Sequence, residues 1–487
     1  MKTAATRSKK TALATISGQM AEFAAGLRYE DLPADVRDLA GMVLLDTLGC
    51  GLAGAATDEL KQIRQAMRDA GGDSGDTVLW GTRERAPLPL AALANGAASH
   101  AREMDDFGGC AHSGAVVVPA AIGAAARTGA SGRELLTAIV IGYDIAKRAM
   151  DGGGGYLPFK HRGWHSTSVC GGFGAAAAVG RLLGLDAERL QWALGYAGSN
   201  AGGTWAFIPE GAMSKRVHPG FAAQSGIVAA YLAANSVTGP ASIFEAEWGG
   251  FFPTYVGDAA TPQKAVENLG TDFRIRVVGI KPYAACRGNH SSIDSILGLR
   301  REPGIRAPDV DRVIVRGNAT HVKQLGRQNV ETMLDAQFSL PYSIAVALGT
   351  GGAMLDQYTP DALRRPDILT LARQVTVVAD DAVAEGDQPF VDVYLKDGRK
   401  LSKRVLVARG DYRNPLTAEE VRAKFRTNAG QVLEPGQVLK LEQAIARVAD
   451  MSDITELADL LVPQAGRRAV RRKAHATGKR FKRGARR

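Results

Sequence analysis

A segment of fifteen residues, HAREMDDFGGCAHSG at 100–114, carries two imidazoles, three carboxylates and one thiol. Side chains three apart are neighbours on a helix, so we expect His100, Glu103 and Asp106 to share a face if the preceding helix continues. A Phe-Gly-Gly sequence then breaks the pattern and places His112 in a loop. A solvated helix end is the simpler interpretation. The mixture of proton-transferring groups instead favours an acid–base site at the mouth of a pocket.

Four further clusters combine such groups with Gly, Pro or Ser. They are GWHSTS with His165, MSKRVHPG with Lys215, Arg216 and His218, KPYAACRGNH with Lys281, Cys286, Arg287 and His290, and QFSLPY with Tyr342. Each alone is ordinary: a lone His or a Lys-Arg pair is usually structural or solvated, and a Tyr usually belongs to the core. With His100 and His112 of the first segment, they place five of the eight histidines at junctions between elements, where rigid scaffolds tend to carry binding sites.

The composition is that of a soluble globular protein of two or three domains, with 487 residues of which 45% are hydrophobic and 23% charged. The net charge of +10 comes from residues 467–487, which hold eleven Lys or Arg and no acid, so the rest of the chain has a charge of −1. Such a tail favours disorder and nonspecific polyanion binding. No signal peptide or membrane span is expected, and four scattered cysteines without a C-x-x-C pair favour reduced thiols in the cytoplasm.

Periodicity predicts a mainly α fold with an inserted α+β domain. Helices are expected at 11–27, 33–48, 60–70, 131–150, 166–183, 186–197, 219–234, 338–348, 417–426, 436–448 and 453–461, and strands at 310–316, 375–379, 390–395 and 401–407. Asp31, Ser131 and Thr417 are predicted helix caps, and Asp397-Gly398 a hairpin turn. The large helical domain would combine residues 11–272 and 409–465, with an α+β lid domain at 273–408 and a basic tail at 466–487.

Four motifs in this order, HAREMDD, GWHSTSVCGGFG, MSKRVHPGFAAQSG and KPYAACRGNHSSID, resemble the MmgE/PrpD family. The family includes 2-methylcitrate dehydratase, cis-aconitate decarboxylase and iminodisuccinate epimerase. The resemblance implies a helical domain with a smaller lid, usually in a homodimer, and a reaction without cofactor or metal. A divalent metal on His100, Glu103 and His112 is the alternative weighed against this.

The resemblance also implies roles for the residues. We expect His165 and His112 to transfer protons, with Glu103 or Asp105 orienting one of them. Lys215, Lys281 and His218 would hold substrate carboxylates, with Tyr342 as a hydrogen-bond donor or proton relay. The remaining substrate-binding candidates are Arg216, Cys286, Arg287 and His290.

Three positions depart from the family pattern: Glu103 stands where many members have Asp, Phe107 where a Thr is common, and Cys286 where decarboxylases carry a His. These departures weaken an assignment to the decarboxylase. The resemblance therefore leads us to expect a hydro-lyase of the 2-methylcitrate dehydratase type, acting on a small di- or tricarboxylate. An epimerase of an imino- or amino-dicarboxylate begins with the same proton abstraction and is the alternative. A different class is an inactive scaffold that binds polyanions through the tail.

Overall fold

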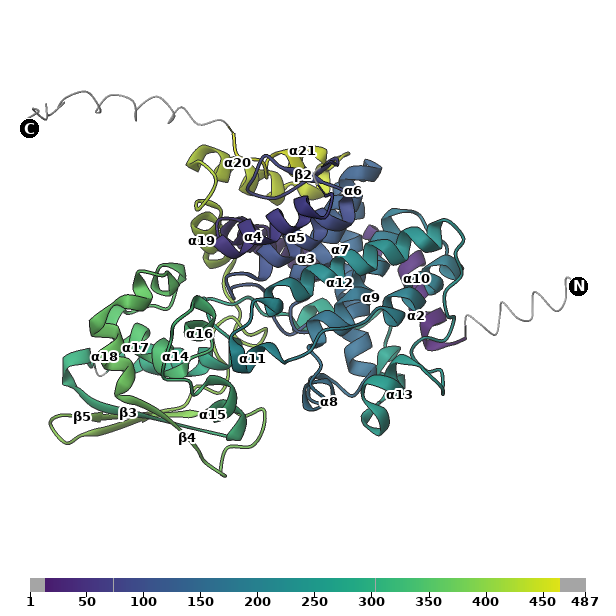
Figure 1. The fold of residues 1–487 in the computed structure, drawn as a ribbon. Helices are drawn as coiled ribbons and strands as arrows, with labels where there is room; N and C mark the ends of the chain where they lie inside the picture. The colour runs from purple at the N-terminus through teal and green to yellow at the C-terminus, as the bar shows by residue number, and fades with distance from the viewer. Residues whose placement is uncertain (1–13, 73, 303, 465–487) are drawn as a thin grey trace, which may run out of the picture.

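The computed structural model describes residues 14–72, 74–302 and 304–464 (Figure 1). The basic tail lies outside these residues. We call α2–α13 with α19–α21 the helical domain, and α14–α18 with β3–β6 the lid domain. In the helical domain the C-terminal helices pack on the N-terminal ones, α19 and α20 on α3 and α21 on α6. The mainly α fold with a small α+β part is confirmed; the predicted domain boundaries stay a prediction.

The helical domain is built from helices of very different length. Its elements are α2 (Ile16–Gly26), α3 (Ala34–Ala55), α4 (Asp58–Asp69), α5 (Leu88–His100), α6 (Gly114–Thr128), α7 (Gly132–Gly152), α8 (Tyr156–His161), α9 (Ser166–Leu182), α10 (Ala187–Ser199), α11 (Phe207–Glu210), α12 (Ser214–Ala234), α13 (Phe251–Tyr255), α19 (Ala418–Ala429), α20 (Pro435–Ala446) and α21 (Thr455–Asp459), with a two-residue hairpin β1 (Thr77–Val78) and β2 (Arg85–Ala86). The sequence pattern missed this hairpin, because its strands are too short to show an alternating pattern.

The lid domain packs helices against one four-stranded sheet. Its elements are α14 (Arg287–Arg301), β3 (Val310–Gly317), α15 (Ala319–Leu325), α16 (Met333–Gln337), α17 (Leu340–Thr350), α18 (Pro366–Arg373), β4 (Val375–Ala379), β5 (Phe390–Leu395) and β6 (Lys400–Lys403). The strand order is β4-β3-β5-β6, with β3 parallel to β4 and antiparallel to β5. The predicted hairpin at Asp397-Gly398 joins β5 and β6, although β6 ends earlier than expected.

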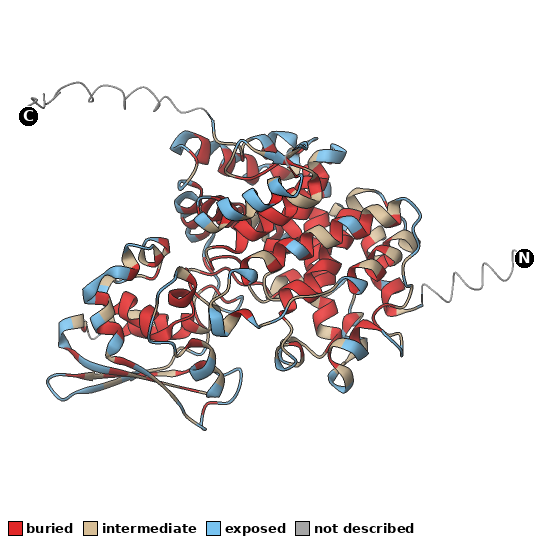
Figure 2. Ribbon diagram, viewed as in Figure 1, coloured by how far each residue is buried: buried red, intermediate tan, exposed pale blue. Residues whose placement is uncertain are grey.

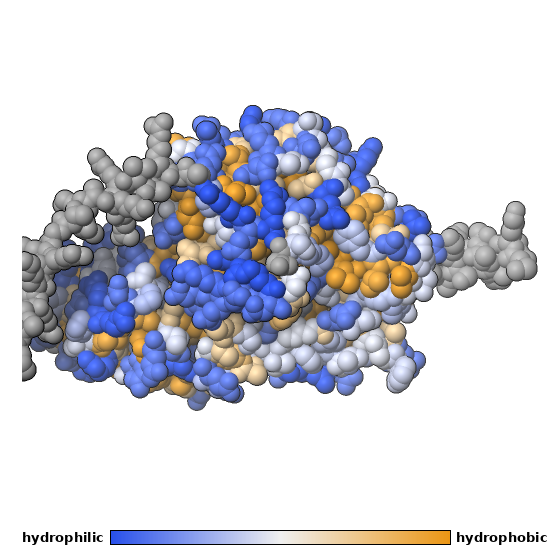
Figure 3. All heavy atoms as spheres, turned by 45° about the horizontal axis from the view of Figure 1, so that its top comes forward, coloured by the Kyte–Doolittle hydropathy of each residue, from blue (hydrophilic) through white to orange (hydrophobic). Residues whose placement is uncertain are grey.

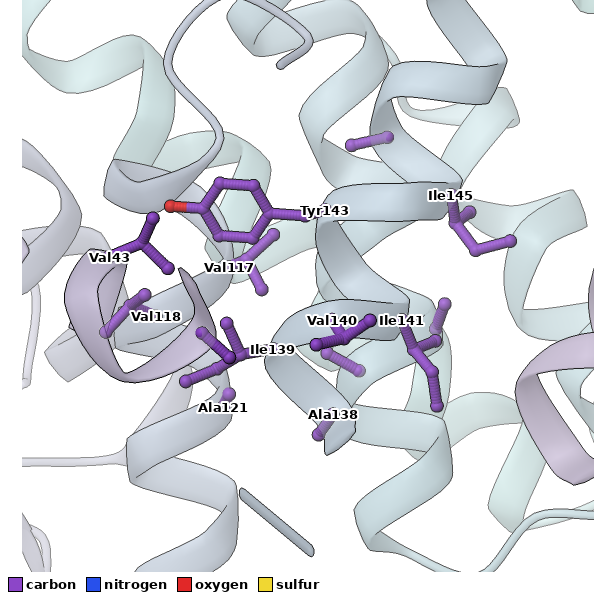
Figure 4. Packing of buried hydrophobic residues seen from close by; sticks show 14 of the residues in the cluster. Val43, Val117, Val118, Ala121, Ala138, Ile139, Val140, Ile141, Tyr143 and Ile145 are labelled. Atoms are coloured by element: carbon purple, nitrogen blue, oxygen red, sulfur yellow. The ribbon is translucent and has the colours of Figure 1, made fainter. Parts of the chain in front are cut away.

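The core of the helical domain forms around α7. Ile139, Val140 and Tyr143 on this helix are fully buried and belong to one cluster with Val117 of α6 and Val43 of α3 (Figure 4). Buried residues fill the centre of both domains and exposed ones follow their outside (Figure 2). A second cluster occupies the lid domain. Each domain therefore has its own hydrophobic core, and the surfaces where the two domains meet remain available for polar groups.

Small residues bring the helices that carry the site close together. A Cβ on Gly174 of α9 would lie 2.3 Å from the carbonyl oxygen of Gly142 on α7, and one on Gly220 of α12 would lie 2.2 Å from that of Leu93 on α5. Any larger residue would push these helices apart. Glycine at these positions therefore fixes α12, which carries three site residues, against α5.

Side-chain caps explain several helix starts. Ser131 and Thr417 form the predicted capping boxes with Glu134 and Glu420. The prediction for Asp31 is wrong: α3 is preceded by Pro33, and Asp31 instead ends a short 3-10 turn, paired with Arg28. Proline suits a helix start because its missing N–H would have no partner there.

One helix among the described residues, α3, is long and apolar enough to cross a membrane, which the sequence analysis had not expected. In its most apolar window, 78% of the residues are buried inside the protein. Its apolar composition is therefore accounted for by packing in the core. The face in Figure 3 is mainly hydrophilic, with smaller hydrophobic patches between.

Candidate active site

The loop between α5 and α6 holds the first motif. α5 ends at His100, and Glu103 has a left-handed backbone with a φ of +52°. Few residues other than glycine adopt this conformation, and it breaks the helical path. The prediction that His100, Glu103 and Asp106 share a helical face is therefore wrong. Asp106 instead accepts hydrogen bonds of 3.0 and 3.2 Å from the backbone N–H of Gly114, at the start of α6.

Glu103 is the centre of a buried cluster of charges. Its Oε1 contacts Nζ of Lys215 and lies 3.7 Å from Arg216, and its Oε2 lies 3.3 Å from Nζ of Lys281. Asp105 adds a second carboxylate, 3.5 Å from Lys281. All five side chains are at most 2% exposed. Three positive and two negative charges leave one positive charge in excess, so the cluster can accept a further carboxylate.

Backbone pairing brings Lys281 to this cluster. The N–H of Phe107 donates to the carbonyl of Gly279 at 2.9 Å, and the N–H of Gly279 donates back at 2.8 Å. The N–H of Ile280 donates to Gly410 at 2.9 Å. The segment that enters the lid domain is thus joined to the first motif and to the segment that leaves the lid.

Two imidazoles flank Asp105. Nδ1 of His100 lies 2.7 Å from Asp105, and its Nε2 lies 2.7 Å from Nζ of Lys215. Nδ1 of His112 lies 2.8 Å from the carbonyl oxygen of Asp106 and 3.2 Å from Asp105. A carbonyl oxygen can only accept, so Nδ1 of His112 carries the hydrogen. A neutral His112 then has its lone pair on Nε2, the nitrogen that can take a proton.

Burial sets the protonation of these groups. It lowers the pKa of His100 to about 3, although Asp105 opposes the shift. Burial and the charge of Lys215 also lower the pKa of His165 well below its usual value, and that of His218 to about 4. The pKa of Lys215 is itself lowered by burial, against the effect of Glu103. Neutral imidazoles therefore lie beside an ammonium group that gives up its proton more readily than usual.

His165 and His218 form a second pair of imidazoles. His165 precedes α9, and its Nδ1 lies 3.0 Å from Nδ1 of His218. One nitrogen must donate and the other accept, so the two rings hold different tautomers. The His165 ring is 6.5 Å from the ring of His112 and meets Trp205 edge-on at 5.1 Å. His218 also lines a separate cavity of about 570 Å³, and so connects that cavity to His165.

A cavity of about 520 Å³ lies between the two domains, next to the charge cluster around Glu103. From the helical domain it is lined by Glu103, His112, Trp205 and Lys215 among others, and from the lid domain by Cys286, Arg287 and Phe338 among others. Lys281 and His165 are not among the residues that line the cavity. Lys281 contacts Glu103, which does line it, and the His165 ring lies 6.5 Å from that of His112. A ligand between the domains would therefore meet imidazole, ammonium and guanidinium groups.

The lid residues of the fourth motif divide into two groups. Arg287, at the start of α14, stacks over the Phe107 ring at 4.5 Å and pairs with Asp411 at 3.2 Å. Its Nη1 is buried and has no hydrogen-bond partner within the described residues. Burial raises the pKa of the neighbouring Cys286, which keeps it a thiol. His290 points elsewhere, with its Nε2 at 3.1 Å from the carbonyl of Ala285.

Two predictions about where site residues lie need correction. Lys215, Arg216 and His218 lie within the first turns of α12, not before the helix, which begins at Ser214. The structure does not bring Tyr342 to the cluster. Its hydroxyl donates to the carbonyl of Gln357 at 2.7 Å, and its side chain lines a different cavity.

Sequence reasoning missed Lys424 on α19. Its ammonium donates to the carbonyl oxygen of Met104, between the two acids of the cluster, and pairs with Asp46 of α3 at 2.6 Å. Both charged side chains are at most 3% exposed. The hydrophobic spacing of α19 predicts burial of this face, but nothing local indicates which loop the lysine meets. His100 was noticed, but its bridging position between Lys215 and Asp105 was not.

The described residues contain one group whose spacing would suit a metal ion. One ligand atom each from His100, Asp105 and His112 can lie within 4.8 Å of the others. The ammonium of Lys215 lies 2.7 Å from His100, and that of Lys281 lies 3.5 Å from Asp105. A further cation between these two positive charges would be repelled. The geometry therefore favours the lysines, not a metal, as the cations of the site.

The fold and the cluster define a two-domain α protein with an acid–base site between a helical and an α+β domain. The model of the MmgE/PrpD N-terminal domain matches residues 18–263, and that of the C-terminal domain matches residues 283–450. The chain belongs to the MmgE/PrpD family.

Three relatives match nearly the full chain. The cis-aconitate decarboxylase-like protein oryM of Aspergillus oryzae is 30% identical, covering 92% of this chain and 97% of its own length. The cis-aconitate decarboxylase of Aspergillus terreus is 28% identical, covering 92% and 96%. The human cis-aconitate decarboxylase is 27% identical, covering 92% and 95%.

Proposed function

We propose that this protein is a lyase without a cofactor that breaks a bond beside a carboxylate of a small di- or tricarboxylate. The observation that carries the proposal is the convergence of two imidazoles and two ammonium groups on Glu103 and Asp105 beside the cavity. Taking a proton from a carbon next to a carboxylate adds negative charge to an anion. Lys215 and Lys281 are placed to stabilise that charge, and a buried site makes the stabilisation larger than in water.

Dehydration, of the 2-methylcitrate dehydratase type, is the reaction that we favour. Nε2 of His112 takes the proton from the carbon beside the carboxylate, and the electron pair of that bond forms the double bond. The hydroxyl group leaves as water with a proton from the ammonium of Lys215. The reaction needs an imidazole nitrogen with a lone pair, which the contact of Nδ1 with the Asp106 carbonyl leaves to Nε2 of His112, and a readily donating ammonium, which burial favours at Lys215. Each such group contributes about 10²–10⁴-fold to the rate.

Decarboxylation is a second candidate, because the three relatives above are named as cis-aconitate decarboxylases or as like them. In this reaction the substrate loses carbon dioxide, and the bonding electrons stay on the carbon, which takes a proton from Lys215. A proton donor suffices, so His112 would not act as a base in the bond-breaking step. Epimerisation would share the proton abstraction of dehydration, with a second acid returning the proton to the opposite face.

One proton NMR experiment in D₂O distinguishes these reactions. The protein is incubated with 2-methylcitrate, cis-aconitate, a 2-alkylmalate and an aminodicarboxylate in turn. Dehydration produces new alkene signals, decarboxylation gives the signals of a product that has lost one carboxyl group, and epimerisation gives a deuterated product of otherwise unchanged composition. If no compound of any of these classes shows exchange or turnover, the proposed function is wrong.

The role of His112 has its own test. His112→Asn should lower kcat by about 10²–10⁴-fold, because asparagine cannot take up the proton. His161→Gln is the matched control: the His161 side chain is 57% exposed and belongs to neither imidazole pair. A folded H112N protein with the dehydration rate of the wild type would remove His112 as the base.

Assembly and location stay proposals as well. We propose a homodimer in the cytoplasm, with a basic tail that binds polyanions without sequence preference. Light scattering gives the oligomeric state. Truncation after Pro463 should abolish polyanion binding and leave turnover unchanged. Loss of turnover in the truncated protein would contradict an accessory role of the tail.

A further inference from the structure

The cavity between the domains is lined by more residues than those of the charge cluster, and many of these additional residues are uncharged. Its volume of about 520 Å³ falls within the range of about 300–1,000 Å³ that is typical of sites for drug-sized ligands. Charged groups of the site gather at one part of its wall, which we call the inner wall: Glu103, His112, Lys215 and Arg287. The part formed by α7, α8, α15 and residues 385–388 is the outer wall.

The outer wall is largely apolar or neutral. Met150, Tyr156, Leu157 and Leu325 supply its apolar surface, and the remaining uncharged groups are amides, a hydroxyl and the imidazole of His321, whose pKa is lowered by burial. Contacts of Glu385 with Lys160 and Thr320, both at 3.4 Å, hold residues of α8, α15 and the 385–388 segment together. These contacts join α8, α15 and the 385–388 segment into one continuous part of the cavity wall.

The two lysines of the outer wall already have carboxylate partners. Lys147 pairs with Asp151, and Lys160 pairs with Glu385. Asp387 on the same wall is an acid that already pairs with Arg404 at 3.2 Å. A substrate carboxylate placed here would have to displace one of these partners and would meet the negative charge of Glu385. The outer wall therefore disfavours an anionic group.

The inner wall can accept only a limited negative charge. The cluster around Glu103 has one positive charge in excess, and Arg287, which lines the cavity and pairs with Asp411, has a buried Nη1 without a hydrogen-bond partner among the described residues. These two groups can each partner one substrate carboxylate, and a third carboxylate would have no further unpaired cation among the described residues that line the cavity. We propose that the substrate is a dicarboxylate with a neutral, largely apolar substituent, which lies against the outer wall. This inference rests on the proposed function and narrows its substrate class.

Binding of unreactive analogues tests the inference without turnover. Succinate and its 2-methyl, 2-butyl and 2-hexyl derivatives have no leaving group, and calorimetry gives their Kd values with the full-length protein. Each methylene that is buried should lower Kd roughly fourfold, until the substituent fills the outer wall. The 2-hexyl chain ending in a carboxylate should lose this gain, because it would face Glu385.

Variants locate the substituent. Leu157→Asn should remove the dependence on chain length; Leu157 is 36% exposed, so the substitution does not open a hole in the core. Leu406→Asn, at a site on the lid surface with 64% exposure, is the matched control and should keep the dependence. Lys215→Met should weaken the binding of every member of the series, including succinate.

The results separate this inference from the proposed function. Equal Kd values along the series in the wild type, or an unchanged dependence in L157N, would overturn the apolar subsite alone. Tighter binding of the carboxylate-terminated chain than of the methyl-terminated chain would do the same. If K215M binds all compounds as the wild type does, the charge cluster does not hold the carboxylates, and the proposed function fails with it.

Discussion

Replacing Glu103 by glutamine tests the physical basis of the charge cluster. The substitution keeps the shape of the side chain and removes the charge that Lys215, Lys281 and Arg216 share. Asp105 alone would then face three positive charges, so the excess rises from one to two. Volume is conserved, so no cavity forms, and the loss in stability is electrostatic.

The size of this loss follows from the burial of the groups. Removing one partner of a buried ion pair costs about 3–5 kcal/mol, because the remaining charges lose their compensation. The entropy of unfolding is about 2.1 cal/mol/K per residue, or about 1 kcal/mol/K for this chain if it unfolds as one unit. The Tm of E103Q should therefore lie about 3–5 °C below that of the wild type.

A dicarboxylate should restore what the substitution removes. In E103Q, succinate can supply the missing negative charge, so it should raise the Tm of the variant more than that of the wild type. Differential scanning calorimetry at several succinate concentrations measures both effects. Turnover of E103Q should fall as well, because Lys215 loses the partner that holds it in place.

A second ion pair provides the control. Glu442 accepts two hydrogen bonds of 2.7 Å from Arg426 on the neighbouring helix, away from the cavity. Glu442→Gln should lower the Tm without any increased response to succinate. If E103Q melts with the wild type, or responds to succinate no more than E442Q does, the carboxylate of Glu103 does not balance the lysines.

Three further outcomes follow from buried groups of the site. Burial, with the charges of Asp105 and Asp46, raises the pKa of Asp106 to about 8, so the folded state holds a proton that the unfolded chain loses near pH 4. The free energy of unfolding therefore falls between about pH 4 and pH 8, by up to about 1.4 kcal/mol per pH unit. Urea titrations at several pH values should show that Asp106→Asn lacks this fall. If the free energy of unfolding of the variant and of the wild type changes equally with pH, Asp106 does not hold the proton. EDTA dialysis should leave turnover unchanged, and a loss restored by a divalent metal would show that the lysines are not the site's only cations. Lys424→Met should cost about 3–5 kcal/mol because Asp46 and the Met104 carbonyl lose their partner, and adding Asp46→Asn should recover part of this; strictly additive losses would show that the pair does not act as a unit.

Local chemistry made several elements predictable from sequence. The capping boxes of Ser131 and Thr417 depend only on residues three positions apart in the sequence. The Asp397-Gly398 turn depends only on two adjacent residues. The start of α12 was misplaced for a related reason. Proline commonly opens a helix, so the pattern favoured Pro219, whereas α12 begins at Ser214 without a side-chain cap.

The residue types of the site could also be recognised, but their pairing could not. His112, Lys215 and Lys281 stand in motifs rich in glycine and proline, and the structure brings all three to Glu103 or Asp105. Tyr342 stands in a similar motif, yet its hydroxyl is used within the lid. A motif shows which reactive side chains are present. Which residues these side chains contact depends on the packing of segments that are distant in the sequence.

The left-handed backbone of Glu103 shows why such pairing lies beyond a local pattern. A non-glycine residue pays about 1–2 kcal/mol for this conformation, so nothing in the sequence around position 103 would select it. The contacts that offset it come from α12, from the entry to the lid, and, through the Met104 carbonyl, from Lys424. The loop geometry is therefore a product of the assembled domains. Because the same contacts hold the ammonium groups in place, the positions of the acids and of the cations around the cavity are set together when the lid docks.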